Sequence, residues 1–436
     1  MILLVFLDCL SVFLAFHFAM LSRFGTCQGL TFWLTFGFLF LITFSVFLYQ
    51  NLYDRKRYVN QTKIFLKIVI SSFYIIILYI LVCFFTKFRF LELSRIGILL
   101  FFVYFLGLNI VFRILIVPSL FEKWFGRQER KRKVEIFAGD KHREKIISML
   151  QEYPILGFQN CDITKEECTN TAFLWCEGKD LSIVYSNIKE KLKKYVLIEA
   201  VIPAFQNLRM EPTWTRIGDM PVWEFNRGNH RRFTDCAIRL FDILGSILAI
   251  ILLGIPMLIV ALLVRIDSGS PVLFRQERVG KDGKLFTFLK FRSMQDGTSS
   301  KTHKGYMKTL INGEKKDGEI FKPEENKEIT RFGRFIRKTS IDELPQFFNV
   351  LKGDMSIVGP RPPIPYEVEM YKEWHKERLK IKPGITGAWQ VFGRSSLPFD
   401  KSVFLDLYYK ENRCWTFNFY LFLKTIPRVL TSVGAE

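Results

Sequence analysis

The chain has 436 residues, more than one ordinary hydrophobic core supports, and this length predicts two or three folding units. Its formal net charge is +20, yet 49% of its residues are hydrophobic and 45 of them are phenylalanine. This combination excludes a disordered chain and a secreted disulfide scaffold. A chain that is both basic and apolar is expected to meet anionic lipid headgroups or phosphates.

Four apolar stretches fill the first quarter of the chain. Each has about the 20 residues that a helix needs to cross a bilayer core, and each is nearly free of charge. A cleaved signal peptide would instead show a basic first segment and a single apolar run. We therefore predict a four-helix transmembrane domain over residues 1–120, in which helix pairing or snorkelling explains Asp8 and Arg113 better than transport does. The stretches are Met1–Leu21, Leu30–Tyr49, Ile64–Phe85 and Ile96–Val117.

The charges of the connecting segments predict the orientation of this domain. Residues 50–63 and 118–133 hold four and six Lys and Arg residues, whereas residues 22–30 and 87–95 hold one and three. Because basic loops stay on the cytoplasmic side of a membrane, both ends of the domain are expected in the cytoplasm. The segment that follows is then expected there too.

Residues 133–225 have the composition of a soluble domain. Short strand-like runs alternate with helical patterns, which predicts a small Rossmann-like α/β domain. The turn at residues 138–143, A-G-D-K-H-R, lacks the G-x-G-x-x-G pattern that cradles a dinucleotide, so a scaffolding role is favoured. Strands are expected at Val134–Ala138, Leu181–Val184 and Tyr195–Val201, and helices at His142–Glu152 and Ser186–Lys194.

A fifth apolar stretch, Ile243–Val264, has 22 residues without a charge. At about 1.5 Å per residue it is long enough to cross a bilayer, but basic clusters lie on both sides of it. Pro256, near its middle, removes a backbone hydrogen bond and bends or breaks a helix. The pattern favours a re-entrant helix at about 240–264 that turns at Pro256 and returns to the cytoplasmic face. An ordinary proline-kinked span is the alternative.

The C-terminal part of the chain is predicted to form one domain over residues 230–436 that includes the re-entrant helix. Residues 299–327 are polar and rich in Lys and Glu, and are expected to form a mobile insertion. Three later segments mix aromatic residues with Lys and Arg, as helices on a membrane surface do. The predicted fold class is thus an integral membrane protein of α plus α/β type. The three amphipathic segments are Tyr366–Lys380, Val403–Cys414 and Trp415–Val433.

Two adjacent carboxylates, Asp342 and Glu343, follow a run of basic residues that ends with Arg337 and Lys338. A capping box formed by Ser340 and Glu343 explains the acids but not the cations. Phosphoryl chemistry explains both, because a carboxylate nucleophile or Mg²⁺ ligand must work among positive groups that hold an anionic substrate. Spacing alone leaves the two interpretations open.

Other motifs in the same domain supply more cations. Arg361 lies between prolines that restrict the backbone, so its guanidinium is suited to hold a phosphate with little loss of entropy. Lys290 and Arg292 follow the strand-like run Leu285–Leu289 and are candidates to bind substrate phosphates. The turn at residues 382–387 offers backbone amides that suit a site. Each motif is weak alone, but all of them fall in one domain next to a membrane helix.

Six strings occur in the C-terminal part of the chain in this order: R-L-F-D at 239–242, K-F-R-S-M at 290–294, T-S-I-D-E-L-P-Q at 339–346, G-D-M-S-I-V-G-P-R-P at 353–362, P-G-I-T-G at 383–387 and L-D-L-Y-Y at 405–409. With these strings the chain resembles the bacterial sugar transferases, which are polyprenyl-phosphate hexose-1-phosphate transferases. The resemblance is specific over the last 200 or so residues. The four apolar stretches and the middle domain are similar to those of the larger, multi-domain branch of the family, by arrangement more than by motif.

The resemblance implies transfer of a sugar 1-phosphate from a UDP-sugar to undecaprenyl phosphate, with release of UMP and with Mg²⁺ as cofactor. It implies that Asp342 is the nucleophile that forms a covalent phosphosugar intermediate and that Glu343 is its partner, the two also holding the metal. Arg337 and Arg361 match the phosphate-binding arginines, and Pro256 matches the proline that breaks the re-entrant helix. The expected location is the bacterial inner membrane, with the catalytic domain facing the cytoplasm, at the first membrane step of exopolysaccharide, O-antigen or capsule synthesis.

Two other classes of function compete with this enzyme. A non-catalytic membrane scaffold for polysaccharide assembly would tolerate substitution of Asp342 and Arg361. A membrane-tethered nucleic-acid binder would use the net charge of +20, but the basic residues gather at membrane borders and around carboxylates, so no nucleic acid is expected as a partner. The sequence leaves open which sugar is transferred and the oligomeric state, a homo-oligomer included.

Overall fold

The computed structural model divides the chain into two compact units, residues 1–177 with 197–224 and residues 178–196 with 225–436. The domain boundaries predicted at 1–120, 133–225 and 230–436 stay predictions. The residues described by the structure are 2–24, 30–50, 52–53, 61–86, 95–120, 132–139, 142–144, 146–148, 158–160, 171–176, 180–205, 216–217, 220–226, 232–294, 305, 307–309, 311, 329–393 and 397–430. Most of the predicted insertion at 299–327 lies outside them.

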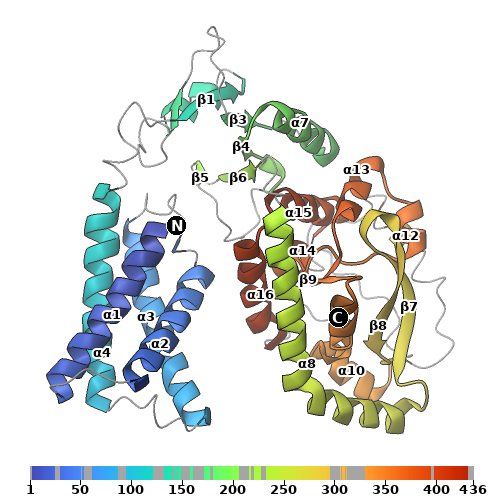
Figure 1. The fold of residues 1–436 in the computed structure, drawn as a ribbon. Coiled ribbons are helices and arrows are strands. Elements are labelled where there is room, and N and C mark those ends of the chain that lie inside the picture. The colour runs from blue at the N-terminus through green and yellow to red at the C-terminus, as the bar shows by residue number, and fades with distance from the viewer. Residues whose placement is uncertain are drawn as a thin grey trace. The chain divides into compact units, whose positions relative to one another are not determined.

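Four long apolar helices begin the first unit and pack against one another in a bundle (Figure 1). Each is long and apolar enough to cross a membrane. The four predicted membrane helices are therefore confirmed as helices, and the last of them continues as a short π-helix. Their bounds are α1 (Ile2–Phe24), α2 (Leu30–Tyr49), α3 (Gln61–Thr86), α4 (Arg95–Ile110) and the π-helix η3 (Val111–Ile116).

A buried ion pair joins the first and last of these helices. The Nη2 atom of Arg113 lies 2.7 Å from Oδ2 of Asp8, and both side chains are almost completely buried. Arg113 also donates a hydrogen bond of 2.7 Å to the backbone carbonyl of Leu52. This confirms helix pairing as the role of Asp8 and Arg113, because the guanidinium binds groups inside the bundle.

The rest of the first unit holds a six-stranded sheet in the order β2-β1-β3-β4-β6-β5. The neighbouring pairs β1–β2, β1–β3 and β3–β4 are parallel, and β5 pairs antiparallel with β6. Its core includes Val134, Phe173 and Val201, which alternate along their strands with residues of the opposite face. The bounds are β1 (Arg132–Phe137), β2 (Phe158–Asn160), β3 (Thr171–Trp175), β4 (Leu197–Val201), η6 (Pro203–Phe205), β5 (Arg216–Ile217) and β6 (Met220–Asn226).

The predicted strand at residues 181–184 is wrong, because these residues form the first turn of α7 (Leu181–Lys194). Asp180 caps this helix by accepting a hydrogen bond of 2.9 Å from the backbone N–H of Ser182. The apolar residues recur at helical spacing and form one buried face, which outweighs the local β-branched run. That face includes Leu181, Val184, Tyr185, Ile188 and Leu192.

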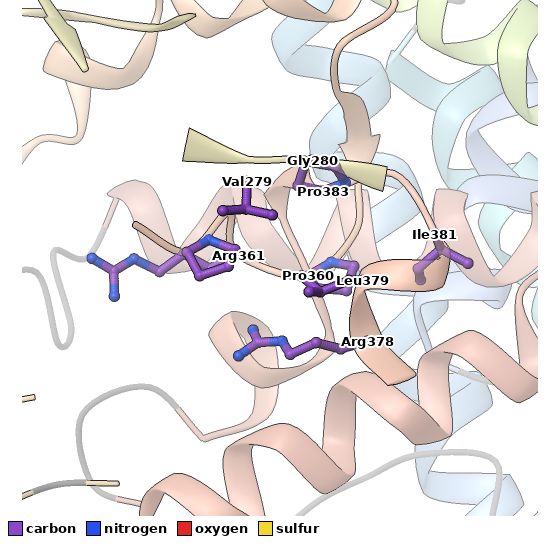
Figure 2. A pocket seen from close by; sticks show the side chains of 9 residues that line it. Val279, Gly280, Pro360, Arg361, Arg378, Leu379, Ile381 and Pro383 are labelled. Carbon is purple, nitrogen blue, oxygen red and sulfur yellow. The ribbon is translucent and has the colours of Figure 1, made fainter. Parts of the chain in front are cut away.

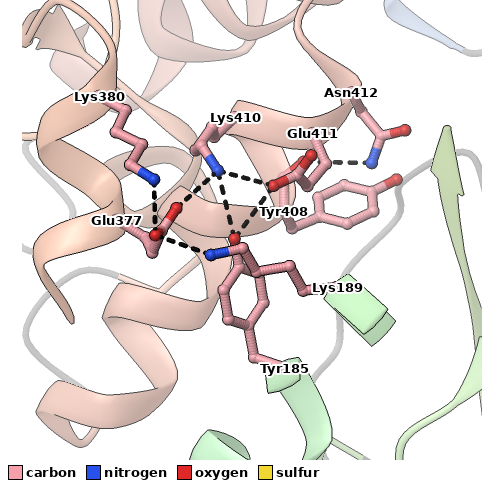
Figure 3. A network of polar contacts seen from close by, with 8 residues as sticks. All are labelled: Tyr185, Lys189, Glu377, Lys380, Tyr408, Lys410, Glu411 and Asn412. Atoms are coloured by element: carbon pink, nitrogen blue, oxygen red, sulfur yellow. Dashed lines mark hydrogen bonds and ion pairs between the residues drawn. The ribbon is translucent and has the colours of Figure 1, made fainter. Parts of the chain in front are cut away.

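Helix α7 belongs to the second unit, although it lies between β3 and β4 in the chain. Figure 3 shows its contact with the C-terminal helices. The hydroxyl of Tyr185 donates a hydrogen bond of 3.0 Å to Glu411, and Nζ of Lys189 lies 2.9 Å from Glu377. Lys410 lies 3.2 Å from Glu377 and 2.8 Å from Glu411, so it joins the two carboxylates.

The longest helix, α8 (Arg232–Ser268), has 37 residues and contains Pro256. Straight, it would measure about 55 Å, nearly twice the hydrocarbon thickness of a bilayer. Figure 1 shows it bent, with a long first segment and a shorter second one that runs across it. A proline inside the helix provides the physical reason for such a bend, because it leaves one carbonyl without its helical donor.

The first segment of α8 carries two polar residues that attach it to the second unit. Arg239 donates hydrogen bonds of 2.6 and 2.8 Å to the carbonyls of Val350 and Leu351, at the end of helix α11 (Gln346–Lys352). The carboxylate of Asp242 accepts hydrogen bonds of 2.9 Å from the Ser356 hydroxyl and from the backbone N–H of Ile357. These contacts attach the polar N-terminal part of α8 to the rest of the second unit.

Two small sheets complete the second unit. Strands β7 (Leu273–Val279) and β8 (Leu285–Phe291) form an antiparallel hairpin around η7 (Lys281–Gly283), so the strand predicted before Lys290 is confirmed. Strands β9 (Ser356–Val358) and β10 (Gly384–Thr386) pair in parallel, where a turn was expected. The backbones approach so closely that a Cβ at Gly384 would lie 2.0 Å from the nitrogen of Gly359. Glycine is required at this crossing for lack of space.

The predicted amphipathic segments differ from one another in the structure. Residues 366–380 form three short pieces and not one helix, and the prediction of a surface helix at 403–414 is wrong because most of α15 is buried. Only α16 keeps an exposed apolar face, which includes Trp415. The bounds are α12 (Pro365–Glu369), α13 (Glu373–Lys376), η10 (Glu377–Lys380), α14 (Ala388–Phe392), α15 (Phe399–Asn412) and α16 (Trp415–Leu430).

Candidate active site

The two adjacent carboxylates lie in a short turn between two helices. The basic helix α10 (Arg331–Lys338) begins at Thr330, whose side chain accepts a hydrogen bond of 2.9 Å from the backbone N–H of Gly333. After α10 the chain turns sharply at Ser340, which has a φ of +57°, and enters the 3₁₀ turn η9 (Ile341–Glu343). A left-handed conformation is strained for a residue other than glycine. The acid pair therefore follows a constrained reversal of the chain.

The capping box predicted for Ser340 and Glu343 is not formed. The side chain of Ser340 makes no capping hydrogen bond, and the backbone N–H of Glu343 instead donates to the carbonyl of Ser340 at 3.2 Å. A capping serine needs extended backbone, whereas Ser340 is left-handed. Helix capping by Ser340 therefore does not explain the acid pair.

Apolar packing connects this turn to the apolar helix α8. The second part of α8 contributes Met257, Val260 and Val264 to a buried cluster that also contains Ile336 of α10 and Phe291 of β8. The residues on either side of the acid pair, Ile341 and Leu344, pack against the same cluster. The helix that the sequence predicts to lie in the membrane therefore supports the turn that carries the acids.

Asp342 is buried, with 7% of its surface exposed. Burial raises the pKa of Asp342, and the positive charges of Lys290 and Arg337 offset part of this rise. In the described part of the chain, no cation forms an ion pair with Asp342 within 4.0 Å. The carboxylate is thus near two cations that stabilise its charged form without an ion-pair contact, and it also accepts a hydrogen bond from its own backbone N–H.

Lys290 and Arg337 approach the acids from two different elements. Lys290 lies near the end of β8, half-buried, with Nζ 5.1 Å from the ring centre of Phe274. Burial lowers the pKa of Lys290, the charge of Asp342 opposes this change, and Arg337 reinforces it. The structure therefore brings Lys290, Arg337 and Asp342 into one electrostatic cluster.

Arg361 lies in the loop after β9, half-buried, and Arg278 of β7 is its neighbour. Burial lowers the pKa of Arg278 to about 10, and the charge of Arg361 adds to this effect. Sequence reasoning treated Arg278 only as part of a basic cluster next to the membrane helix. The sequence does contain a signal for this position. Asp282-Gly283 is a typical hairpin turn, and the strand register that it sets places Arg278 opposite Phe286 on the inner face of the hairpin.

Arg292 makes contacts of a different kind. Its Nη1 atom donates a hydrogen bond of 3.0 Å to the carbonyl of Ser270, and its Nε atom donates one of 3.2 Å to the carbonyl of Met294. These bonds attach the end of β8 to the segment that follows α8. Phosphate binding by Arg292 stays a prediction.

A small pocket lies next to Arg361 (Figure 2). Its described lining does not include Asp342 or Glu343. It is lined by the ends of β7, the proline-rich loop and η10, and it contains two guanidinium groups. The lining residues are Val279, Gly280, Pro360, Arg361, Pro363, Arg378, Leu379, Ile381 and Pro383.

The described residues contain no cluster of three or more His, Cys, Asp and Glu side chains that would enclose a metal ion. Mg²⁺ is commonly held by one or two carboxylates together with substrate phosphates and water. Asp342 and Glu343 offer hard oxygen ligands of that kind. The donor set suits a magnesium ion that binds with a phosphorylated substrate.

Comparison with known proteins gives the family. A model of the bacterial sugar transferases matches residues 233–432. An uncharacterized sugar transferase of Bacillus subtilis is 39% identical over 198 residues, which make up 45% of this chain and 89% of that protein. The chain belongs to the bacterial sugar transferase family. The matched region contains α8, the acid pair, Lys290 and Arg361.

Two longer relatives carry more specific names. A galactosyl transferase of Streptococcus agalactiae is 45% identical over 203 residues, or 46% of this chain and 43% of that protein. An undecaprenyl-phosphate galactose phosphotransferase of Salmonella typhimurium is 35% identical over 271 residues, or 59% of this chain and 55% of that protein. The chain thus matches about half the length of these relatives.

Proposed function

We propose that this protein transfers a sugar 1-phosphate from a UDP-sugar to undecaprenyl phosphate and releases UMP. The observation that supports it best is the buried carboxylate of Asp342, which lies beside Lys290 and Arg337 without being paired to either. Family membership and the names of the relatives support the reaction class. The reaction is the first membrane step in the synthesis of an exopolysaccharide, capsule or O-antigen.

In the first step, an oxygen of Asp342 attacks the phosphorus that carries the sugar. The bond from this phosphorus to the bridging oxygen breaks, and UMP leaves with the electron pair. In the second step, a phosphate oxygen of the lipid attacks the same phosphorus, the bond to Asp342 breaks, and the carboxylate is restored. Each step exchanges one phosphate linkage for another, which explains the use of a covalent intermediate.

The cations around Asp342 have a separate part in this mechanism. A carboxylate that attacks a diphosphate meets repulsion between anions, and Lys290, Arg337 and Arg361 reduce this repulsion by holding the phosphates. The partial burial of the cluster strengthens these interactions relative to water. Asp342 and Glu343 would hold Mg²⁺, which supplies charge neutralisation at the phosphates when bound.

The lipid acceptor requires that the site lie at a membrane surface. The shape of α8 supports a re-entrant helix, since it is bent and its exposed face from Leu240 to Leu263 is apolar. Both ends of such a helix lie on the cytoplasmic side of the inner membrane, where UDP-sugars are found. A thiol-labelling experiment checks this: in a cysteine-free background, cysteines at Asp235 and Lys281 should react with an impermeant reagent from the same side. Reaction from opposite sides would establish a span instead.

The reaction itself is tested with the full-length protein in lipid nanodiscs. A panel of UDP-sugars is supplied with undecaprenyl phosphate and Mg²⁺, and released UMP is measured. We expect UMP release with at least one sugar, ping-pong kinetics, and a phosphosugar adduct on the wild-type protein that is absent in Asp342→Asn. A folded protein that releases no UMP with any sugar would reject the enzyme and favour a scaffold of polysaccharide assembly.

A further inference from the structure

The strand that carries Lys290 is attached to helix α11 by one polar side chain. Asn349 of α11 is 2% exposed, and its amide contacts the backbone of β8 at two points. Its Nδ2 atom donates a hydrogen bond of 2.7 Å to the carbonyl of Thr287, and its Oδ1 atom accepts one of 3.1 Å from the backbone N–H of Leu289. A side-chain amide has the donor and acceptor of a peptide group, so Asn349 pairs with β8 as a neighbouring strand does.

These two hydrogen bonds make the contact directional. Apolar packing is non-directional, and it tolerates a small shift of a helix along a strand. A hydrogen bond weakens steeply when its length or angle changes, and a buried amide that loses a partner destabilises the fold. Asn349 therefore holds β8 at one position along its length, between residues 287 and 289.

The acid pair is joined to α11 by continuous helical turns. The backbone N–H groups of Leu344, Phe347 and Phe348 each donate to the carbonyl three residues earlier, at 3.1–3.2 Å. The turn η9 thus runs directly into α11. Asn349, seven residues after Asp342, is rigidly connected to that carboxylate through these turns.

Lys290 directly follows Leu289 in β8, and its charge interacts with that of Asp342. The strength of such an interaction depends on the separation of the two charges. Because Lys290 belongs to β8 and Asp342 precedes α11, this separation depends on how the strand is placed against the helix. Asn349 supplies two directional bonds at that contact.

We propose that Asn349 is a positioning residue, which sets the place of Lys290 relative to the carboxylate of Asp342. It acts through Lys290 and not on the substrate. Its effect on the rate rests on the proposed function, in which Lys290 holds a phosphate for attack by Asp342. A misplacement of about 1 Å in such a site costs up to about 10²-fold in rate.

The informative substitution is Asn349→Ala, which removes both hydrogen bonds to β8 and keeps a good helix former in α11. If the alanine variant does not fold, Asn349→Ser tests the same contact, because its hydroxyl is too short to make both bonds. The matched control is Ser356→Ala. The hydroxyl of Ser356 is also buried and donates a hydrogen bond of 2.9 Å to Asp242, so this variant loses a buried bond of the same unit elsewhere.

The first measurement is the kcat of UMP release by the full-length protein in lipid nanodiscs. Asn349→Ala should lower kcat by about tenfold or more. In a Lys290→Gln background the same substitution should cost less than about twofold, because the side chain that it positions is gone. A merely structural role lowers kcat by equal factors in both backgrounds. Ser356→Ala should give equal factors, close to one.

The second measurement does not need the transferase reaction. The rate at which an amine reagent labels Lys290 is followed by mass spectrometry, with Lys284 as the internal standard because it is exposed in the same hairpin. Loss of the two bonds should make local opening of β8 easier and speed the labelling of Lys290 by about tenfold. Labelling of Lys284 should stay unchanged, as should that of Lys290 in Ser356→Ala.

The outcomes separate this role from the proposed function. If the wild type releases UMP, the kinetics decide: an unchanged kcat in folded Asn349→Ala, or an equal loss in both backgrounds, overturns the positioning role. If the wild type releases no UMP, the proposed function fails and the labelling decides. Faster labelling of Lys290 in Asn349→Ala then supports Asn349 as the residue that places this lysine, and an unchanged rate overturns it.

Discussion

Two buried aspartates of the same domain have opposite surroundings. Asp406 of α15 is 1% exposed and forms an ion pair with Arg378, and it also accepts a hydrogen bond from the backbone N–H of Trp389. Asp342 is 7% exposed and lies near Lys290 and Arg337 without an ion-pair contact to either, within the described part of the chain.

The difference indicates which carboxylate is free to react. The oxygens of Asp406 are occupied by protein donors, so this residue holds α15 and η10 together. The charge of Asp342 is stabilised by the nearby charges of Lys290 and Arg337 and by a hydrogen bond from its own backbone N–H, and no cation of the described residues pairs with its oxygens. Burial of a carboxylate is common to a structural and a reactive role, and the direct contacts distinguish them.

The largest effect is expected for Asp342→Asn. Loss of the nucleophile should lower kcat by about 10³-fold or more, because asparagine does not form the covalent intermediate. Burial raises the pKa of Asp342, which means that its charged form is disfavoured in the fold. The variant should therefore unfold at the same temperature as the wild type or higher. Retained activity would remove Asp342 from the mechanism, and a large loss of stability would make it structural.

Asp406→Asn should have the reverse effect. It leaves the buried guanidinium of Arg378 without its counter-charge, which lowers the free energy of unfolding by about 3–5 kcal/mol. Thermal unfolding in nanodiscs measures the loss. A variant as stable as the wild type would show that the ion pair does not hold η10 and α15 together, and the contrast with Asp342 would then fail.

The pH dependence of activity gives a finer test. A carboxylate nucleophile acts when ionised, so kcat/KM falls as the pH falls through the pKa of Asp342. The charge of Lys290 lowers this pKa, so Lys290→Gln should raise it and move the acid limb of the profile to higher pH. Lys352→Gln is the control, since Lys352 is exposed and pairs with Asp354. An unmoved acid limb in Lys290→Gln would place Lys290 outside the electrostatic cluster.

The smallest effect is expected where helix α7 meets η10. Lys189 is half exposed, so Lys189→Ala should lower the free energy of unfolding by less than about 1 kcal/mol.

Burial raises the pKa of Glu377, but hydrogen bonds from Lys380 and Lys189 and the charge of Lys410 outweigh it and lower this pKa to about 2. The stabilisation from Glu377 is thus present above its ordinary pKa and is lost as the pH falls towards about 2. Thermal unfolding between pH 7 and pH 3 measures both effects.

Local patterns in the sequence predicted the elements whose signal is strong. The long apolar helices, the strand before Lys290 and the acid pair among cations all carry such signals. Residues 181–184 carry no such clear signal and were predicted as a strand. Their β-branched run also fits one face of a helix, and Asp180 caps that helix. Helix α15 mixes aromatic and charged residues like a surface helix, yet its Asp406 is buried. The partner of Asp406, Arg378, lies 28 residues earlier in the chain, so the pattern of α15 alone does not reveal this burial.

The amino-acid sequence by itself determined the membrane character, the apolar helix with its proline and the grouping of Asp342 and Glu343 with basic residues, because these depend on composition and short spacing. Only the tertiary structure decided which charges are paired. Whether Asp406 pairs with Arg378, whether Asp342 is left without an ion pair among the described residues, and whether Arg278 lies beside Arg361 depend on strands and helices that are distant in the chain. Direct contact and burial are properties of the folded arrangement, and they separate a structural carboxylate from a reactive one.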